Sequence, residues 1–157
     1  MKKDIFIDNN IASRYFSNPI DADYIELIAW LQTFNKNEDE DAYLVVSPFL
    51  LREYFESNRN ANSRTNIAQI IGDFTKQERL VQFNKKQIEA FQTTHFSKKT
   101  MKKLLSNAQD RNHIPIILMS ERRMALSEDN NLIHDLNQIT GFTAITAKRP
   151  EELAYKD

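Results

Sequence analysis

Cysteine is absent from this chain, and glycine and proline are rare, with two and four copies among 157 residues. Without cysteine the chain has no disulfide framework, no thiol nucleophile and no thiolate metal site. Two glycines exclude the glycine-rich loops that bind phosphates or dinucleotides, and the Gly-x-Ser-x-Gly turn of α/β-hydrolases does not occur. Because so few residues interrupt regular structure, we expect a compact fold rich in helix.

Long apolar runs and an excess of positive charge are missing as well. No run approaches the roughly 20 apolar residues of a membrane-spanning helix, and the short run that ends before Asp8 is too brief for a signal peptide. We therefore expect a protein of the cytoplasm, without a membrane partner. The formal net charge is −1, so any attraction of nucleic acid would need a local basic patch or bound cations.

Short apolar runs alternate with helical patterns along the chain. Continuous apolar stretches predict buried strands, and the apolar spacing of three and four residues predicts helices between them. The expected strands are 4–7, 43–46, 80–83, 124–126 and 142–147. The expected helices are 11–16, 21–34, 48–55, 63–74, 85–107, 113–122 and 130–139, the last ended by Gly141. This order predicts a three-layer α/β/α sandwich with a central, mainly parallel sheet of four to five strands. We expect residues 1–157 to form a single domain with a helical insertion at about 58–107.

Two aspartates directly follow expected strands. Asp8 comes after the apolar residues 5–7, and Asp129 comes just after the strand at 124–126. In an open parallel sheet, ligands bind beyond the carboxyl ends of the strands, so both carboxylates would lie at the same edge. Either aspartate could instead simply cap the helix that follows it.

Two further acids are expected near that edge. Glu53 shares a helical face with Phe49 and Leu50, which places a carboxylate at the margin of the core, where it is costly unless paired or metal-bound. The alternatives are a solvated glutamate at the helix edge and a site role for Glu56 instead. Asp110 precedes the helix that leads to the strand at 124–126, although a helix-start acid is also favoured by the helix dipole.

Four carboxylates without an evident histidine partner indicate a hard divalent cation. Magnesium prefers oxygen ligands, and a cation relieves the repulsion between neighbouring carboxylates. Such an ion can activate water and stabilise charge on a scissile phosphate. The three histidines of the chain, His95, His113 and His134, share no metal-ligand spacing. We therefore expect Mg²⁺ or Mn²⁺ on the carboxylates alone.

Four segments together resemble the PIN-domain family. Residues 5–11 resemble its first strand with Asp-x-Asn, 45–53 its second strand and glutamate helix, 125–132 its Ser-x-Asp strand end, and 142–153 its closing strand and Pro-Glu-Glu turn. Residues 58–107 have no counterpart. The resemblance implies a parallel sheet and metal-dependent hydrolysis of phosphodiester bonds. The implied catalytic metal ligands are Asp8, Glu53, Asp110 and Asp129, and the implied supporting residues are Asn10 and Ser127.

Basic residues suggest where a nucleic acid would bind. Lys98, Lys99, Lys102 and Lys103 form two adjacent ridges on an expected helix at 97–105, either a phosphate-binding patch or an ordinary solvated face. Arg14, one turn into the first helix, could reach the rim of the site.

Three functions remain open from the sequence. The first is an endoribonuclease that cuts RNA, since many small proteins of the resembled family are VapC-type toxins, which implies a protein antitoxin and a homodimer as possible partners. The second is a structure-specific DNA nuclease acting on single-stranded DNA or a related substrate. The third is a non-catalytic module that binds nucleic acid or protein.

Overall fold

A single parallel sheet of five strands forms the centre of the protein, as expected. The computed structural model describes residues 1–17, 19–59 and 63–157. Within these ranges the strand order is β3-β2-β1-β4-β5, and every neighbouring pair is parallel. The strands are β1 (Lys3–Ile7), β2 (Ala42–Val46), β3 (Leu80–Gln82), β4 (Met124–Leu126) and β5 (Ile145–Ala147).

The apolar runs explain the order of burial in the sheet. All five residues of β2 are buried, as are four of the five in β1, because helices cover both faces of these central strands. The edge strands β3 and β5 are three residues long and partly exposed. The closing strand is thus shorter than the expected 142–147.

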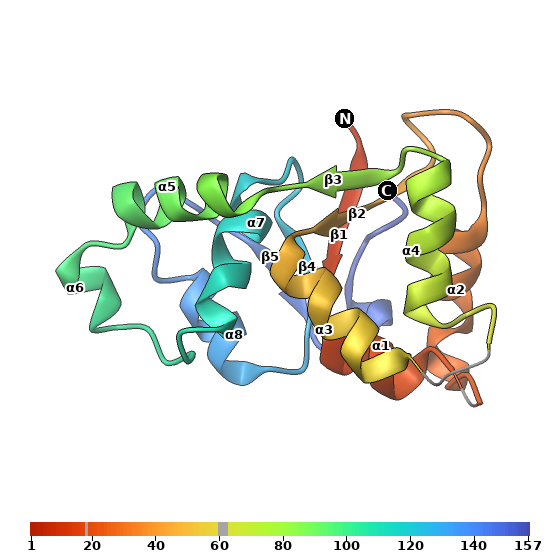
Figure 1. Cartoon of the computed structure of the whole chain (residues 1–157), viewed down its shortest axis with the longest axis horizontal. Coiled ribbons are helices and arrows are strands. Elements are labelled where there is room, and N and C mark those ends of the chain that lie inside the picture. The colour runs from red at the N-terminus through yellow and green to blue at the C-terminus, as the bar shows by residue number, and fades with distance from the viewer. Residues whose placement is uncertain (18, 60–62) are drawn as a thin grey trace.

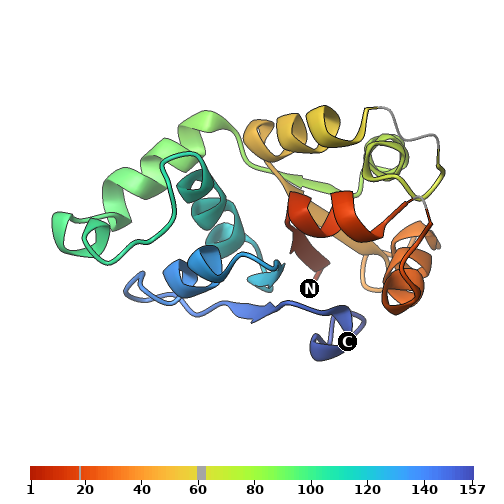
Figure 2. The ribbon, with the colours of Figure 1, turned by 90° about the horizontal axis from the view of Figure 1, so that it is seen from below.

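Helices lie on both sides of the sheet and make the three layers. In Figures 1 and 2, α2 and α4 lie on one side of the strands, and α7 and α8 lie on the other. The helices are α1 (Asn9–Tyr15), α2 (Ile25–Gln32), α3 (Pro48–Asn58), α4 (Ile67–Lys76), α5 (Lys85–His95), α6 (Lys98–Met101), α7 (His113–Met119) and α8 (Asn130–Leu136). Short 3₁₀ turns are η1 (Ala22–Tyr24), η2 (Asp110–Asn112) and η3 (Pro150–Glu152). No helix in the described ranges is both long and apolar enough to cross a membrane.

The start of α3 follows the sequence signal. Ser47 is the N-cap, its Oγ accepts a hydrogen bond from the Leu50 amide at 3.2 Å, and Pro48 is the first helical residue. Proline fits there because the missing N–H has no partner inside the helix. This cap fixes where α3 begins and therefore which of its residues face the sheet.

Residues 85–107 are mainly helical, as expected, but they form two helices and a loop instead of one continuous helix. α5 ends at His95, and Ser97 caps a new single turn, α6, so Lys102 and Lys103 follow a helix instead of lying on one. Beyond α6, buried Asp135 accepts hydrogen bonds from the amides of Leu105 and Ser106, both at 2.8 Å, which holds this part of the chain outside a helix. A tertiary partner thus takes amides that a helix would have used.

The segment expected as a helical insertion contributes to the sheet as well as to the helices. Besides α4, α5 and α6, it supplies β3, which pairs with β2. Residues 60–62 of this segment lie outside the described residues. Gly141 also differs from expectation, because α8 already ends at Leu136, and Gly141, with a φ of 88°, shapes the turn that leads to β5.

Candidate metal centre

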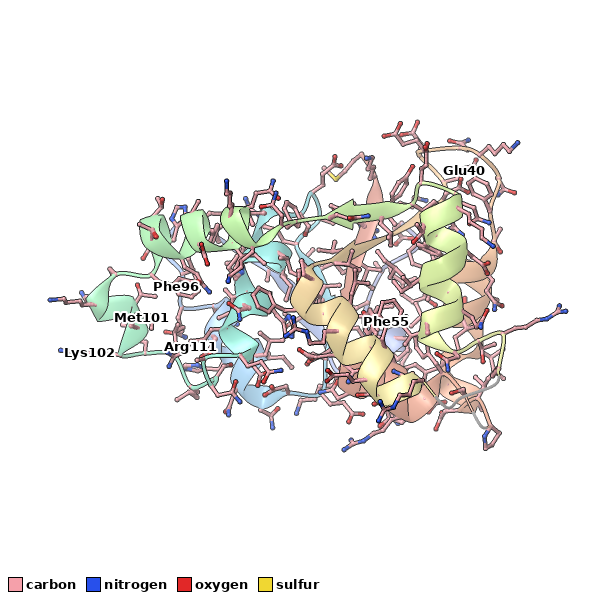
Figure 3. The ribbon with its side chains drawn as sticks, viewed as in Figure 1. Glu40, Phe55, Phe96, Met101, Lys102 and Arg111 are labelled. Atoms are coloured by element: carbon pink, nitrogen blue, oxygen red, sulfur yellow. The ribbon has the colours of Figure 1, made fainter. Side chains whose placement is uncertain are left out.

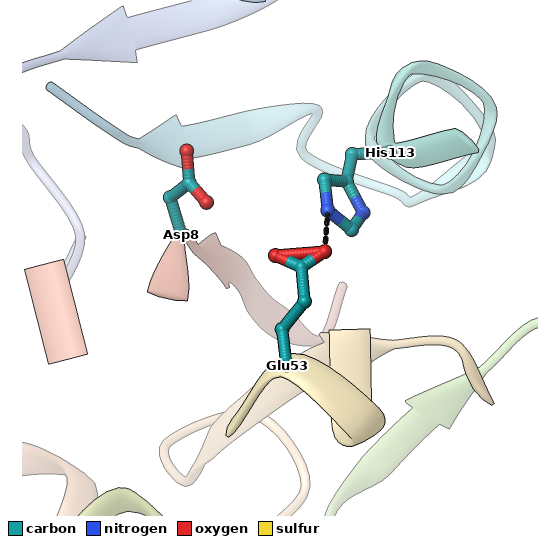
Figure 4. A group of neighbouring side chains, drawn as sticks. All are labelled: Asp8, Glu53 and His113. Atoms are coloured by element: carbon teal, nitrogen blue, oxygen red, sulfur yellow. Dashed lines mark hydrogen bonds and ion pairs between the residues drawn. The ribbon is translucent and has the colours of Figure 1, made fainter. Parts of the chain in front are cut away.

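Three side chains from distant parts of the sequence meet at the carboxyl edge of the sheet. Asp8 follows β1, Glu53 lies on α3 and His113 begins α7. Figure 4 shows the three side chains converging, and one possible ligand atom from each lies within 4.8 Å of the others. Two carboxylates and an imidazole at this spacing could hold a metal ion.

Asp8 is held by both of its carboxylate oxygens. Its Oδ1 accepts a hydrogen bond from the Asn9 amide at 2.8 Å, as the N-cap of α1, and its Oδ2 accepts one from Ser127 Oγ at 2.6 Å. Burial raises the pKa of Asp8, and the Ser127 hydrogen bond offsets part of that rise. A nearby cation would stabilise this buried negative charge.

Glu53 and His113 form a close pair. His113 Nε2 lies 2.7 Å from Glu53 Oε2, and the imidazole is 1% exposed. Burial by itself would lower the pKa of His113, but the hydrogen bond to Glu53 and the charges of Glu53 and Asp8 outweigh it, so the pKa is raised. The imidazole can thus carry positive charge between the carboxylates.

Asp110 and Asp129 lie outside this close group but are electrostatically linked to it. Burial raises the pKa of Asp110 most, and the charges of Asp129 and Glu53 raise it further against the opposing effect of His113. Asp129 is the N-cap of α8, where its Oδ1 accepts hydrogen bonds from the amides of Asn131 at 2.9 Å and Leu132 at 3.3 Å. Asp129 therefore caps the helix that follows it, which was the alternative to a metal-binding role.

Ser127 connects two of the acids. Its Oγ donates to Asp8 and accepts a hydrogen bond from the Asp129 amide at 3.0 Å. Asn10 makes no comparable contact, since its buried Oδ1 has no hydrogen-bond partner among the described residues. Its neighbour Asn9 instead donates to Ser57 Oγ at 2.8 Å. Of the two expected supporting residues, only Ser127 therefore touches a carboxylate of the cluster.

The basic residues expected to contact nucleic acid differ in their ion pairing. Arg14 is exposed, but its guanidinium is paired with Glu128 at 2.5 Å, and Tyr15 donates to the same carboxylate. The lysines at 98, 99, 102 and 103 are exposed and form no ion pair with any described residue. Their charges are therefore available to an anion.

Sequence reasoning missed His113, because it looked for histidines at a metal-binding spacing within one helix. The ligand atoms instead come from three separate elements. Two signals in the sequence were available: His113 is a polar residue in the otherwise apolar run of α7, and it comes one turn after Asp110. A buried histidine needs a hydrogen-bond partner, and an acid site nearby supplies one.

A comparison with known proteins gives no match to any family model and no match to a curated protein sequence. We therefore infer the function from the geometry and chemistry of the site.

Proposed function

We propose that the chain is a metal-dependent endoribonuclease of the PIN type, which hydrolyses RNA at the Asp8–Glu53–His113 cluster. The observation that carries this proposal is the convergence of these three groups at the carboxyl edge of a parallel sheet, where such folds bind ligands. The resemblance of four segments to the PIN family adds the substrate class. A cluster of acids alone would repel RNA, so the proposal requires a cation.

The donor set fits a divalent ion. Asp8 and Glu53 would supply the oxygens, with Asp110 and Asp129 as further acids in reach of its charge. A bound ion would supply the electrostatic stabilisation and activation of water that phosphodiester hydrolysis needs. Oxygen donors suit both Mg²⁺ and Mn²⁺, whereas imidazole suits transition metals better. His113 therefore favours Mn²⁺ over Mg²⁺.

The remaining residues of the site orient the donors. Ser127 holds the Asp8 carboxylate by its hydrogen bond. His113, in contrast, would have to lose its proton and exchange its hydrogen bond to Glu53 for the ion, because only a neutral imidazole is a metal ligand. Fixed orientation of ligands by neighbouring hydrogen bonds increases both metal affinity and activity. Asp110 and Asp129 add negative potential, which increases the local concentration of cations.

The test is cleavage of labelled single-stranded RNA and DNA by the purified chain, with Mn²⁺, Mg²⁺ or EDTA. We predict cleavage of RNA that needs the metal and is faster with Mn²⁺. Asp8→Asn and Glu53→Gln should reduce it below detection while the circular dichroism spectrum is unchanged, because each removes a ligand charge and keeps the shape. Glu56→Gln is the matched control: Glu56 lies exposed on the same helix, three residues after Glu53, and its variant should cleave like the wild type.

The outcomes separate the rival functions. Cleavage of DNA alone would indicate the structure-specific DNA nuclease. Binding of nucleic acid without cleavage under any metal condition would indicate the non-catalytic module. Full activity in Asp8→Asn would contradict the assignment of the cluster as the catalytic site.

A further inference from the structure

A second candidate site lies on the arm of the molecule formed by α5, α6 and the loop that follows them, residues 85–109. In Figure 1, α6 lies at the end of the long axis, far from the sheet. Between this arm and η2 is a pocket of about 310 Å³. This volume is at the lower end of the roughly 300–1,000 Å³ of small-molecule sites. We call this pocket the arm pocket. It is lined by Gln92, Phe96, Met101, Ala108, Arg111 and Asn112.

The arm pocket combines a flat apolar surface with hydrogen-bonding groups. Phe96 and Met101 offer an aromatic ring and a thioether, and Met101 is 36% exposed. Figure 3 shows both on the arm, with Arg111 nearby and Lys102 at the tip. Gln92 Nε2 donates to Asn112 Oδ1 at 3.2 Å, which holds one wall of the pocket in place. This is the combination that a nucleobase needs, with a ring face to stack on and polar groups for its edge.

Arg111 has no anionic partner among the described residues. No carboxylate in the described part of the chain forms an ion pair with its guanidinium, and its buried Nε has no hydrogen-bond partner there. A guanidinium without partners is suited to hydrogen-bond a base edge or a phosphate, and it can stack on a base. None of the residues that line the pocket is acidic, so nothing in the wall competes for it.

The charge around the arm pocket selects the class of partner. Lys98 and Lys99 on α6, and Lys102 and Lys103 directly after it, are exposed and unpaired among the described residues. Arg111 in the pocket wall and these four lysines at the tip of the arm together make five cations on this side of the molecule. A polyanion with exposed rings satisfies both features at once, and a single-stranded nucleic acid is such a molecule.

The arm pocket and the metal cluster adjoin at the start of α7. The 3₁₀ turn η2 carries Arg111 and Asn112, which lie in the pocket wall. Asp110 begins the same turn, and the charges of Asp129 and Glu53 raise its pKa. His113 follows the same turn directly. One end of the arm pocket is therefore next to a ligand of the cluster.

The arm is fixed in place, so the pocket does not have to form on binding. Asp135 anchors the loop through the amides of Leu105 and Ser106. Phe91 of α5 packs against Phe142 with ring centroids 5.2 Å apart. A preformed pocket loses less conformational entropy when its ligand binds.

We propose that the arm pocket binds one unpaired base of single-stranded RNA while the four lysines contact its phosphates, which positions the strand at the metal cluster. This inference rests on the proposed ribonuclease function for the identity of the polymer. It adds a site that selects a base near the cleavage position.

The test measures binding of short labelled RNAs to the full chain in EDTA by fluorescence anisotropy, with each base in turn replaced by an abasic site. We expect one position at which loss of the base weakens binding roughly 5- to 150-fold, the range for base–aromatic stacking. Arg111→Gln and Met101→Ala should remove that difference. Arg64→Gln is the control for charge loss, because Arg64 lies beside α2, away from the arm.

The lysines are tested in the same assay. Replacing all four by glutamine should weaken the binding of every RNA to a similar extent. It should also reduce the slope of log affinity against log salt by roughly 0.7 per lysine. Lys85→Gln with Lys86→Gln, at the far end of α5, is the matched control and should change neither quantity by as much.

Each result either supports or overturns the arm pocket. Equal binding of intact and abasic RNAs at every position, or a base preference that survives Arg111→Gln and Met101→Ala, overturns it, as does failure to bind RNA at all. A base preference without cleavage under any metal condition keeps the pocket and refutes the ribonuclease. Cleavage without any base preference keeps the ribonuclease and refutes the arm pocket.

Discussion

The metal cluster and the arm differ in the sign of their charges and in how exposed these charges are. In the cluster, Asp8 and Glu53 are negative groups at the margin of the core, held by hydrogen bonds from Ser127 and His113. At the tip of the arm, Lys98, Lys99, Lys102 and Lys103 carry positive charges that are exposed and form no ion pair within the described residues. Buried charge needs a compact counter-ion with fixed geometry, whereas exposed charge needs a long, flexible one. This difference is the reason we propose a metal ion for one region and a nucleic acid strand for the other.

The two regions should also respond differently to mutation. In the cluster, one hydrogen bond orients a ligand, so a single substitution should have a large effect. On the arm, several exposed cations act together, and each exposed interaction contributes little by itself. A substitution that disturbs one region and leaves the other intact would sharpen this comparison, and a substitution that disturbs both equally would break it.

Ser127→Ala should have the largest effect of the two single substitutions considered next. It removes the hydroxyl that donates a hydrogen bond to Asp8 Oδ2 and accepts one from the Asp129 amide. We expect metal affinity or cleavage to fall about 10- to 100-fold, as is typical when a neighbour of a metal ligand is lost. RNA binding in EDTA should be unchanged. Equal cleavage by the variant and the wild type would show that Asp8 does not need this contact.

Asp135→Asn should affect the arm and leave the cluster intact. Burial by itself would raise the pKa of Asp135, but hydrogen bonds from the Leu105 amide, His134 and the Ser106 amide outweigh it, so the pKa is lowered. A lowered pKa means that the ionised group stabilises the fold above the usual aspartate pKa, and that this contribution is lost as pH falls through the lowered value. We expect the variant to lose about 1–3 kcal/mol of unfolding free energy at pH 7.

Chemical denaturation at several pH values measures this effect. The gap between Asp135→Asn and the wild type should be full at neutral pH and shrink in acid, below roughly pH 4. Base preference in RNA binding should weaken as the arm loses its anchor, while metal binding stays intact. A gap that does not change with pH would contradict the role assigned to the charge of Asp135.

The sequence was sufficient for the sheet because its signals are local. The strands β1, β2 and β4 are continuous apolar runs, and the cap formed by Ser47 and Pro48 fixes the start of α3. Asp8 and Asp129 could be placed at one edge because the carboxyl ends of parallel strands meet there.

The sequence was insufficient where distant residues decide the structure. Residues 102–107 carry a helical pattern, but Asp135, about 30 residues later, captures the amides of Leu105 and Ser106. His113 was missed for the same reason, since its partner Glu53 lies 60 positions away. No local pattern reports such a pair, because it exists only after the chain has folded.

The central claim is that Asp8, Glu53 and His113 bind a divalent metal ion, and titration of the chain with Mn²⁺ in a calorimeter tests it most directly. We predict saturable binding by the wild type and by Glu56→Gln, and loss of that binding in Asp8→Asn and Glu53→Gln. Binding that is the same in all four proteins, or absent from the wild type, would contradict the claim.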